Sequence, residues 1–314
     1  YTKKEKNMKK IKMFVGVLAL LMLALVSSCG SKKTYKVLVP NGTPLLGMSS
    51  FIEENSENLE YEVVAGSSAL VAGFVNSSYD IIVAPINLGA KMYNQTPNYT
   101  LYKSFVWGNF YLASLNEFTD VNALNGKKIV VFGASSSPDV MFKVVTNYLN
   151  LNVEIEYVDD VASANAMLVS GKAEYILSAE PSISVLRAKK NIYTLSLQSL
   201  WSDATNGKAF PQAGIFIKSG SNTDKEFNKL LNKLTAALDD YKDPKSLAEK
   251  AIKVDDSFSK MGVEALTSAI PNCNFNLYDK TTEKEYVKCY LEKLIELGLA
   301  PQVGGKMPSD EFYG

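Results

Sequence analysis

The sequence predicts an α/β protein of two lobes, each a mixed, mainly parallel sheet flanked by helices, with a helical C-terminal part. Its 314 residues are 46% hydrophobic and 21% charged, a balance typical of a globular chain with a sizeable core. Short apolar runs alternate with helical patterns, as in parallel sheets with crossover helices. This alternation occurs twice along the chain, and helical patterns alone follow it.

The N-terminal segment has the pattern of an export signal. Lysines precede an apolar run from Met13 to Val26, and we expect translation to begin at Met8. The run is too short for a comfortable permanent span of a bilayer. The letters "VSSC" that end it resemble a bacterial lipobox, in which Cys29 would be lipidated and become the mature N-terminus. Residues 1–28 would then be a signal peptide and residues 29–34 a lipid-anchored spacer.

A diacylglycerol on Cys29 would supply the two acyl chains that stable anchoring requires. We therefore expect the protein on the outer face of the bacterial cell membrane, attached to the lipid bilayer through Cys29. A soluble secreted protein, or a cytosolic one with an apolar N-terminus, is the alternative.

Composition narrows the classes of function. Setting aside six lysines and one glutamate in the first 28 residues leaves 27 basic and 32 acidic residues, a net charge of −5. A mildly acidic body argues against nucleic acid as a partner. The chain has no histidine, which excludes histidine-based triads and histidine metal ligands. No nucleophile-elbow, phosphate-loop or zinc-protease motif is present. We predict no enzymatic activity, no metal and no cofactor.

The first series of elements begins after the spacer. The apolar run "YKVLVP" (35–40), the alternating run "LEYEVVAG" (59–66) and the run "YDIIVAP" (79–85) predict strands. Helical spacing in "SSALVAGFVNSS" (67–78) and "INLGAKMYNQ" (86–95) predicts the helices that connect and follow them.

The series then restarts. Apolar runs predict five strands, and helical spacing predicts helices within 134–150 and, after an aspartate cap, 159–171. The predicted strands span 126–133, 153–158, 173–181, 191–197 and 210–220. Helices are predicted in the C-terminal part at 222–243, 244–253, 262–270 and 282–298.

The strand ends indicate where a ligand would bind. Ligands of open α/β sheets bind beyond the carboxyl ends of the strands. Those ends carry the small and polar loops "NGTP", "GSSA", "APIN", "GASSSPD" and "SAEP". Two lobes that face each other would therefore form a cleft lined by these loops.

Four stretches carry a resemblance to a known superfamily. They are "GSSALVAGFVNSSYDIIVAPINLGAKM", "GASSSPDVMFKVVTNYLNLN", "LVSGKAEYILSAEPSISVLRAK" and "FPQAGIFIKSG". In this order, and behind a lipobox, they resemble the type II periplasmic-binding-protein superfamily. The nearest group comprises substrate-binding lipoproteins of ABC importers for nitrate, sulfonates, taurine and thiamine precursors. Glu174 stands where that group's pattern usually has aspartate, and no arginine falls in the predicted loops.

The resemblance implies a two-lobed periplasmic-binding-protein-like fold in which C-terminal elements complete the first lobe. Residues 35–114 and 213–314 would form lobe 1, and residues 115–212 lobe 2, with crossings near 112–118 and 208–214. The implied function is capture of a small extracellular solute by a monomer and its delivery to an ABC permease. The alternatives are an enzyme on the same fold, of the menaquinone or thiamine-pyrimidine synthesis type, and a surface sensor without a transporter.

The predicted ligand-binding residues lie in or near the cleft loops. Serines before Pro138 can cap a helix or bond a ligand, and Gly66 permits close backbone approach to the next loop. Trp107 could stack on a planar ligand, and Glu180 could accept bonds from an amine or amidine. Ordinary turns, caps and core packing are the alternative roles. The full prediction is Asn41, Thr43, Ser67, Ser68, Asn87, Trp107, Ser135, Ser136, Ser137 and Glu180.

Two further cysteines follow Cys29 in the predicted exported part. Cys273 and Cys289 could form a disulfide outside the cytoplasm, closing a short loop before a helix. Two unpaired buried thiols are an equal alternative.

Overall fold

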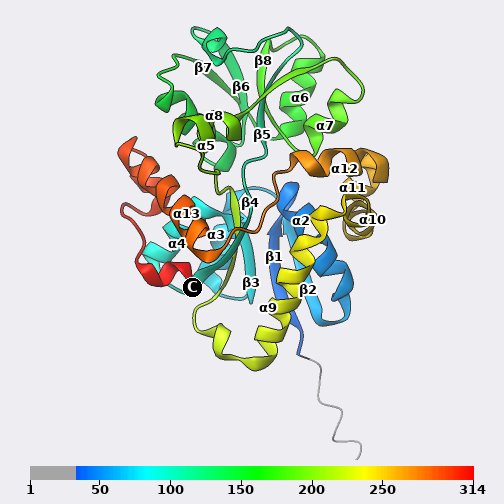
Figure 1. Cartoon of the computed structure of the whole chain (residues 1–314), viewed down its shortest axis with the longest axis vertical. Coiled ribbons are helices and arrows are strands. Elements are labelled where there is room, and N and C mark those ends of the chain that lie inside the picture. Colours follow the sequence, from blue (N-terminus) through cyan, green and yellow to red (C-terminus); the bar gives the residue numbers. More distant parts are fainter. Residues whose placement is uncertain (1–32) are drawn as a thin grey trace, which may run out of the picture. The chain divides into compact units, whose positions relative to one another are not determined.

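The structure, a computed structural model, describes residues 33–314, and its strands form two five-stranded sheets (Figure 1). The first has the order β2-β1-β3-β10-β4 and the second β7-β6-β8-β5-β9. The strands are β1 (Tyr35–Pro40), β2 (Leu59–Val64), β3 (Ile81–Pro85), β4 (Tyr99–Val106), β5 (Phe110–Ser114), β6 (Lys128–Phe132), β7 (Glu154–Val158), β8 (Tyr175–Ala179), β9 (Tyr193–Ser196) and β10 (Ala213–Lys218).

Helices flank both sheets. The α-helices are α2 (Thr43–Glu54), α3 (Ser67–Asn76), α4 (Ile86–Gln95), α5 (Ser137–Tyr148), α6 (Val161–Val169), α7 (Ser182–Arg187), α8 (Leu197–Ala204), α9 (Lys225–Leu238), α10 (Pro244–Val254), α11 (Asp256–Met261), α12 (Val263–Ala269) and α13 (Lys280–Glu296). The short 3-10 helices are η1 (Ser56–Asn58), η2 (Val121–Leu124), η3 (Ser221–Thr223), η4 (Asp239–Lys242), η5 (Ile270–Asn272), η6 (Ala300–Val303) and η7 (Asp310–Tyr313).

Each sheet contains one reversed strand. In the first sheet β1 pairs in parallel with β2 and β3, whereas β10 pairs antiparallel with both β3 and β4. The second sheet repeats this arrangement, with β5 antiparallel to both β8 and β9. The other four strands of each sheet run in one direction. The predicted fold class, two mixed and mainly parallel sheets flanked by helices, is confirmed.

Helices cover both faces of the two sheets. Buried side chains of α2, α9 and α10 share one cluster with β1 and β10, and α6 and α7 pack on one face of the second sheet. The other faces pack against α3, α4 and α13 in the first sheet and α5 and α8 in the second (Figure 1). Helix α4 approaches β10 closely: a Cβ on Gly89 would lie 2.0 Å from Cζ of Phe216. Only glycine therefore permits this contact.

The chain crosses between the sheets earlier than the sequence predicted. Strand β4 belongs to the first sheet and β5 to the second, so the first crossing spans residues 107–109. The prediction that placed residues 110–114 in lobe 1 and the crossing near 112–118 is therefore wrong. The return crossing precedes β10, which begins at Ala213, and this agrees with the predicted 208–214.

Most predicted elements are present, and a few were not foreseen. The sequence did not predict β4 and β5 as strands, nor α8 and α11 as helices of their own. The signal peptide of residues 1–28, the start at Met8, the lipidation of Cys29 and most of the 29–34 spacer lie outside the described residues. Within residues 33–314, no helix is long and apolar enough to cross a membrane.

Candidate ligand-binding cleft

Strand-end loops from both sheets line one cavity of about 300 Å³. The first sheet contributes the loops after β1 and β3, and the second contributes those after β6 and β8. A neighbouring cavity of about 200 Å³ shares Pro40, Pro85, Ser137 and Pro138 with it. We call the two together the cleft, and the larger part the 300 Å³ cavity. The prediction that these loops converge is confirmed.

Most of the predicted binding residues line the cleft. The 300 Å³ cavity is lined by Asn41, Thr43, Ser137 and Glu180, and the adjoining one by Ser67, Asn87, Ser135, Ser136 and again Ser137. Ser68 lines neither cavity and is exposed to solvent. Contact of these residues with a ligand stays a prediction.

Trp107 does not line the cleft. It is 2% exposed, its Nε1 donates to the carbonyl oxygen of Asn276 at 2.9 Å, and its ring packs edge-on against Tyr278 at 4.7 Å. Because the side chain is buried and lines neither cavity, Trp107 is a core residue, and its prediction as a cleft wall is wrong. The aromatic rings that do line the cavity are Phe110, Phe132 and Phe258, and the first two are 6.1 Å apart.

Among the residues that the structure describes, Glu180 is the only ionisable one that lines the 300 Å³ cavity. It is 3% exposed, and its carboxylate accepts hydrogen bonds from the hydroxyl and the backbone N–H of Ser184, at 2.8 and 3.3 Å. Burial raises the pKa of Glu180 to about 7, and the bonds from Ser184 and the charge of Arg187 oppose that rise only in part. The carboxyl group is therefore poised to exchange a proton near neutral pH.

A hydrogen-bonded junction joins the two lobes beside Glu180. The Thr43 hydroxyl, at the start of α2, donates to the carbonyl oxygen of Glu180 at 2.7 Å. Asn109, in the first crossing, donates from Nδ2 to the Thr43 hydroxyl and from its backbone N–H to Oε1 of Gln212 at 2.8 Å. Gln212 lies in the return crossing, so the two crossings are bonded to each other at the cleft.

Sequence reasoning missed Asn109 and Gln212, although both line the 300 Å³ cavity. Both are buried polar residues, 2% and 7% exposed, within segments otherwise rich in apolar side chains. The signal that could have found them is an amide side chain in each crossing, since a buried amide requires partners. The misplaced first crossing hid this signal.

The loop before α5 is organised by Asp139. Its carboxylate accepts from the backbone N–H of Ser135, from Lys143 and from the Tyr157 hydroxyl, at 2.8, 2.9 and 2.9 Å. Ser136 occupies the N-cap position, but its hydroxyl donates back to the Gly133 carbonyl and does not cap the helix. The predicted serine cap is therefore replaced by a carboxylate in the first turn, which also satisfies the helix dipole.

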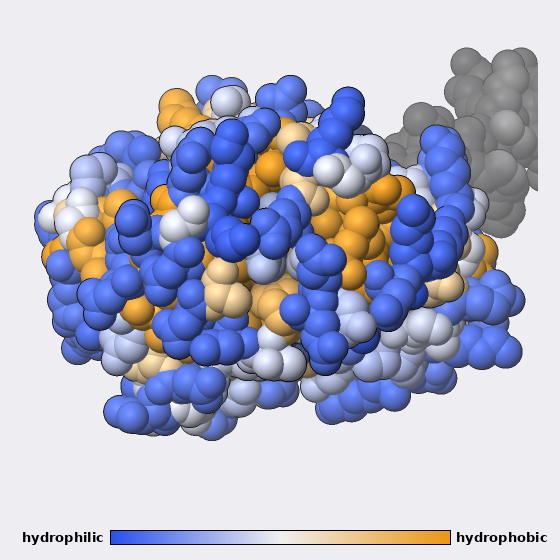
Figure 2. Space-filling model, turned by 90° about the horizontal axis from the view of Figure 1, so that it is seen from above, coloured by the Kyte–Doolittle hydropathy of each residue, from blue (hydrophilic) through white to orange (hydrophobic). Residues whose placement is uncertain are grey.

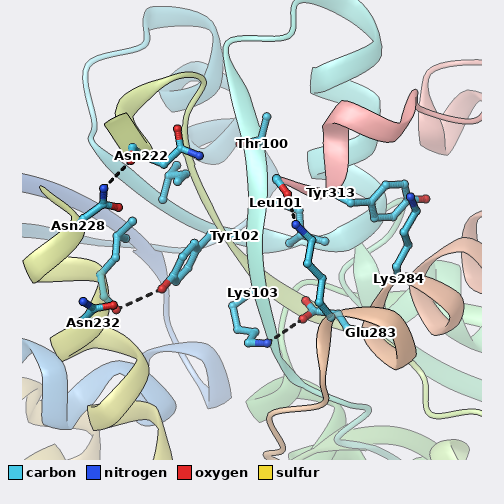
Figure 3. A pocket seen from close by; sticks show the side chains of 14 residues that line it. Thr100, Leu101, Tyr102, Lys103, Asn222, Asn228, Asn232, Glu283, Lys284 and Tyr313 are labelled. Carbon is cyan, nitrogen blue, oxygen red and sulfur yellow. Dashed lines mark hydrogen bonds and ion pairs between the residues drawn. The ribbon is translucent and has the colours of Figure 1, made fainter. Parts of the chain in front are cut away.

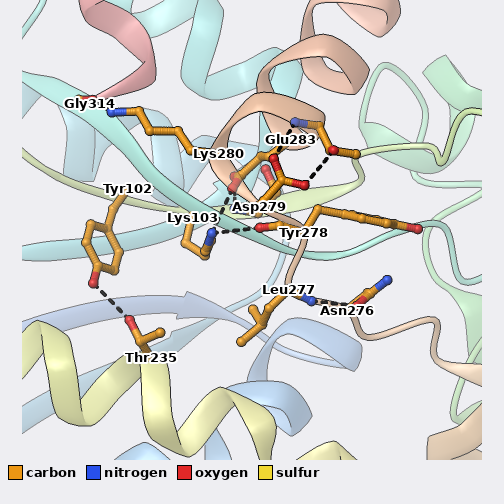
Figure 4. A network of polar contacts seen from close by, with 12 residues as sticks. Tyr102, Lys103, Thr235, Asn276, Leu277, Tyr278, Asp279, Lys280, Glu283 and Gly314 are labelled. Carbon is orange, nitrogen blue, oxygen red and sulfur yellow. Dashed lines mark hydrogen bonds and ion pairs between the residues drawn. The ribbon is translucent and has the colours of Figure 1, made fainter.

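A third cavity, of about 420 Å³, lies at the edge of the first sheet, beside β4, α9 and α13 (Figure 3). Its cationic groups are already paired. Lys103 Nζ contacts Glu283 Oε2 at 3.2 Å and the Tyr278 carbonyl at 3.0 Å, and Lys280 Nζ donates to the Gly314 carbonyl (Figure 4). Glu283 also accepts from the backbone N–H of Ser104. This network fastens α13 to an edge strand, and none of the predicted binding residues lies there.

Neither of the two later cysteines forms a disulfide. Cys273 is fully buried in the core beside α2 and α10, and Cys289 lies partly buried on α13. Of the two alternatives, the structure has the unpaired thiols, and the disulfide is not formed. Among the residues that the structure describes, no group of three or more cysteine, aspartate or glutamate side chains is placed to hold a metal ion.

No protein-family model matches the sequence, and no curated protein is significantly similar to it in sequence. Solved structures do match the fold. An ABC transporter protein from Parabacteroides distasonis has a TM-score of 0.74 at 20% identity, covering 89% of this chain and 98% of that one. The chain has the two-lobed fold of periplasmic substrate-binding proteins.

Two further structures share this fold at lower identity. The periplasmic aliphatic sulphonate binding protein SsuA from Escherichia coli has a TM-score of 0.62 at 11% identity, covering 89% of this chain and 94% of that one. The ligand binding component of an ABC-type import system from Staphylococcus aureus, with zinc bound, has a TM-score of 0.58 at 14% identity, covering 89% and 96%. At these low sequence identities, the similarity shows a shared fold and nothing about the ligand.

The face that Figure 2 shows is mainly hydrophilic, with hydrophobic residues visible between the hydrophilic ones. The large apolar side chains exposed by more than a third are scattered along the described chain: Tyr61, Val75, Leu115, Tyr148 and Tyr157. Such isolated residues are ordinary on protein surfaces, so the cleft is the better supported functional region.

Proposed function

We propose that the protein is a non-enzymatic solute-binding lipoprotein of an ABC import system. It binds a small extracellular molecule in the cleft, closes around it and delivers it to a permease. The proposal rests on the strand-end loops of the two sheets, which converge on one cavity. The two chain crossings between the sheets lie beside this cavity and are hydrogen-bonded to each other. Closure of two lobes about such crossings is a recognised hinge movement, and a ligand that contacts both lobes favours the closed form.

We also propose that Cys29 anchors the protein to the outer face of the cell membrane and that the protein acts as a monomer. The lipobox-like letters of residues 26–29 support the anchor. Replacing Cys29 by serine should release the protein from membranes into the soluble fraction when cells are fractionated. An unchanged membrane fraction would contradict lipid anchoring without affecting the proposed ligand binding.

Ligand binding is tested by a thermal-unfolding screen of the full chain in mild detergent. The panel contains nitrate, alkanesulfonates, taurine, aminopyrimidines and amino acids. A ligand present at about 100 times its dissociation constant should stabilise the protein by about 2.7 kcal/mol. Small-angle X-ray scattering with the same ligand should show a smaller radius of gyration. The proposal fails if no small molecule raises the unfolding temperature or compacts the protein.

A further inference from the structure

The 300 Å³ cavity contains two buried polar atoms without a hydrogen-bond partner, an amide oxygen that can only accept and a serine hydroxyl that can accept or donate. Asn109 Oδ1 and Ser137 Oγ have no hydrogen-bond partner, although the residues are 2% and 8% exposed and both line the cavity. Asn87 Oδ1 is in the same state in the adjoining cavity, at 5% exposure. A buried acceptor without a donor is costly, and such groups in native proteins require an explanation. A ligand that supplies donors would remove the cost.

The orientation of Asn109 is set by its neighbours. Its Nδ2 faces the Thr43 hydroxyl and the Glu180 carbonyl oxygen, so its Oδ1 is the atom left over. The carboxylate of Glu180 lies beside this junction and, within the described part of the chain, receives hydrogen bonds only from Ser184. Each carboxylate oxygen can accept a further bond. We call Glu180 and Asn109 together the acceptor end of the cleft.

The 300 Å³ cavity has few groups that would attract an anion. No lysine or arginine of residues 33–314 lines it. Helices α2 and α5 begin at the cavity, but Pro44 and Pro138 each remove an N–H from the first turn. Asp139 adds a carboxylate to the first turn of α5. One lysine, Lys91, lines the adjoining 200 Å³ cavity instead.

From these observations, and resting on the proposed solute-binding function, we propose that the acceptor end recognises an amine, amidine or similar N–H donor of the ligand. A neutral or cationic nitrogen group would donate to Asn109 Oδ1 and to the Glu180 carboxylate, while Phe110 and Phe132 contact an apolar or ring portion. A simple anion such as a sulfonate would place acceptors against acceptors.

The test uses probes of one shape and opposite hydrogen-bonding character. Benzamidinium donates N–H bonds, benzoate and benzenesulfonate only accept, and all three carry the same ring. Isothermal titration of the full chain in detergent at pH 8 should give at least about tenfold tighter binding of benzamidinium than of either anion, because hydrogen bonds to charged groups are the stronger ones.

Variants then locate the effect. Glu180→Gln should weaken benzamidinium binding about tenfold, while Glu117→Gln, the same change at an exposed position of the second lobe, should match the wild type. The comparison among probes on the wild-type protein needs no variant, so it holds even if Glu180→Gln does not fold.

Two results would overturn the proposal and leave solute binding intact: equal or tighter binding of benzoate or benzenesulfonate, or benzamidinium binding that Glu180→Gln does not change. If no probe binds and no member of the wider solute panel stabilises the protein, the proposed function falls together with this inference.

Discussion

Replacing Glu180 by glutamine should change how the stability of the protein depends on pH. The buried carboxyl has its pKa raised from an ordinary value of 4.5 to about 7, so between these values the folded protein binds more protons than the unfolded chain. The contribution of Glu180 to stability is therefore fully present below about pH 4.5 and is lost as the pH rises through about 7. Converted at 1.36 kcal/mol per pKa unit, the shift corresponds to a loss on the order of 3 kcal/mol.

Glutamine has nearly the same shape but does not titrate. The difference in unfolding free energy between Glu180→Gln and the wild type should therefore rise by about 3 kcal/mol in favour of the variant from pH 4.5 to pH 8. Any constant cost of the altered bonds to Ser184 cancels, because only the change with pH is interpreted. Neighbouring groups that face Glu180, namely Arg187, Tyr111 and Cys273, are present in both proteins.

The assay is urea denaturation followed by circular dichroism at half-unit pH steps, with Glu117→Gln as the matched control. A pH-independent difference between Glu180→Gln and the wild type would refute the reasoning, since it would mean that Glu180 ionises in the folded protein as it does in the unfolded chain. The same pH dependence in Glu117→Gln would refute it equally, because the effect would then not arise at the cleft.

Two further changes test packing roles assigned above. Trp107→Phe should lower the unfolding free energy by about 1–3 kcal/mol, since the Asn276 carbonyl loses its buried donor. Ligand affinity, measured by titration, should not change. A variant with unchanged stability and weaker ligand binding would show that Trp107 contacts the ligand. Glu283→Ala should cost about 3–5 kcal/mol in urea denaturation, because Lys103 and the Ser104 N–H lose their shared carboxylate. On the same helix, Glu285→Ala removes a more exposed partner of Lys208 and should cost less than about 1 kcal/mol; equal losses would contradict the role given to Glu283.

Most strands of the two sheets could be predicted because each is a short apolar run that can be recognised from neighbouring residues in the sequence. Runs such as 37–40 and 81–85 are apolar without interruption, as strands buried on both faces require, and the following loops carry turn residues. Since the carboxyl ends of parallel strands share an edge, the convergence of Thr43, Ser137 and Glu180 on one cavity follows from the strand order.

What could not be predicted depends on partners far along the chain. Strand β4 contains Lys103 and Ser104, which look like surface-loop residues until Glu283, 180 and 179 positions later, satisfies them. Trp107 shows the opposite error: a large aromatic near a crossing suggested a cleft wall, yet Asn276 and Tyr278 enclose it. In both cases the C-terminal segment decides the environment, and no local pattern reveals where that segment lies.

The position of β10 has a consequence for the order in which the molecule can assemble. This strand sits between β3 and β4, although it lies more than 100 residues after both, whereas every strand of the other sheet falls within the continuous segment 110–196. The second sheet can therefore form from residues that are close together in the sequence. The first sheet is complete only when β10, which begins at residue 213, inserts between β3 and β4, and this closes a long loop. A chain interrupted before that point would keep the inserted lobe and leave the lobe that encloses it unfinished.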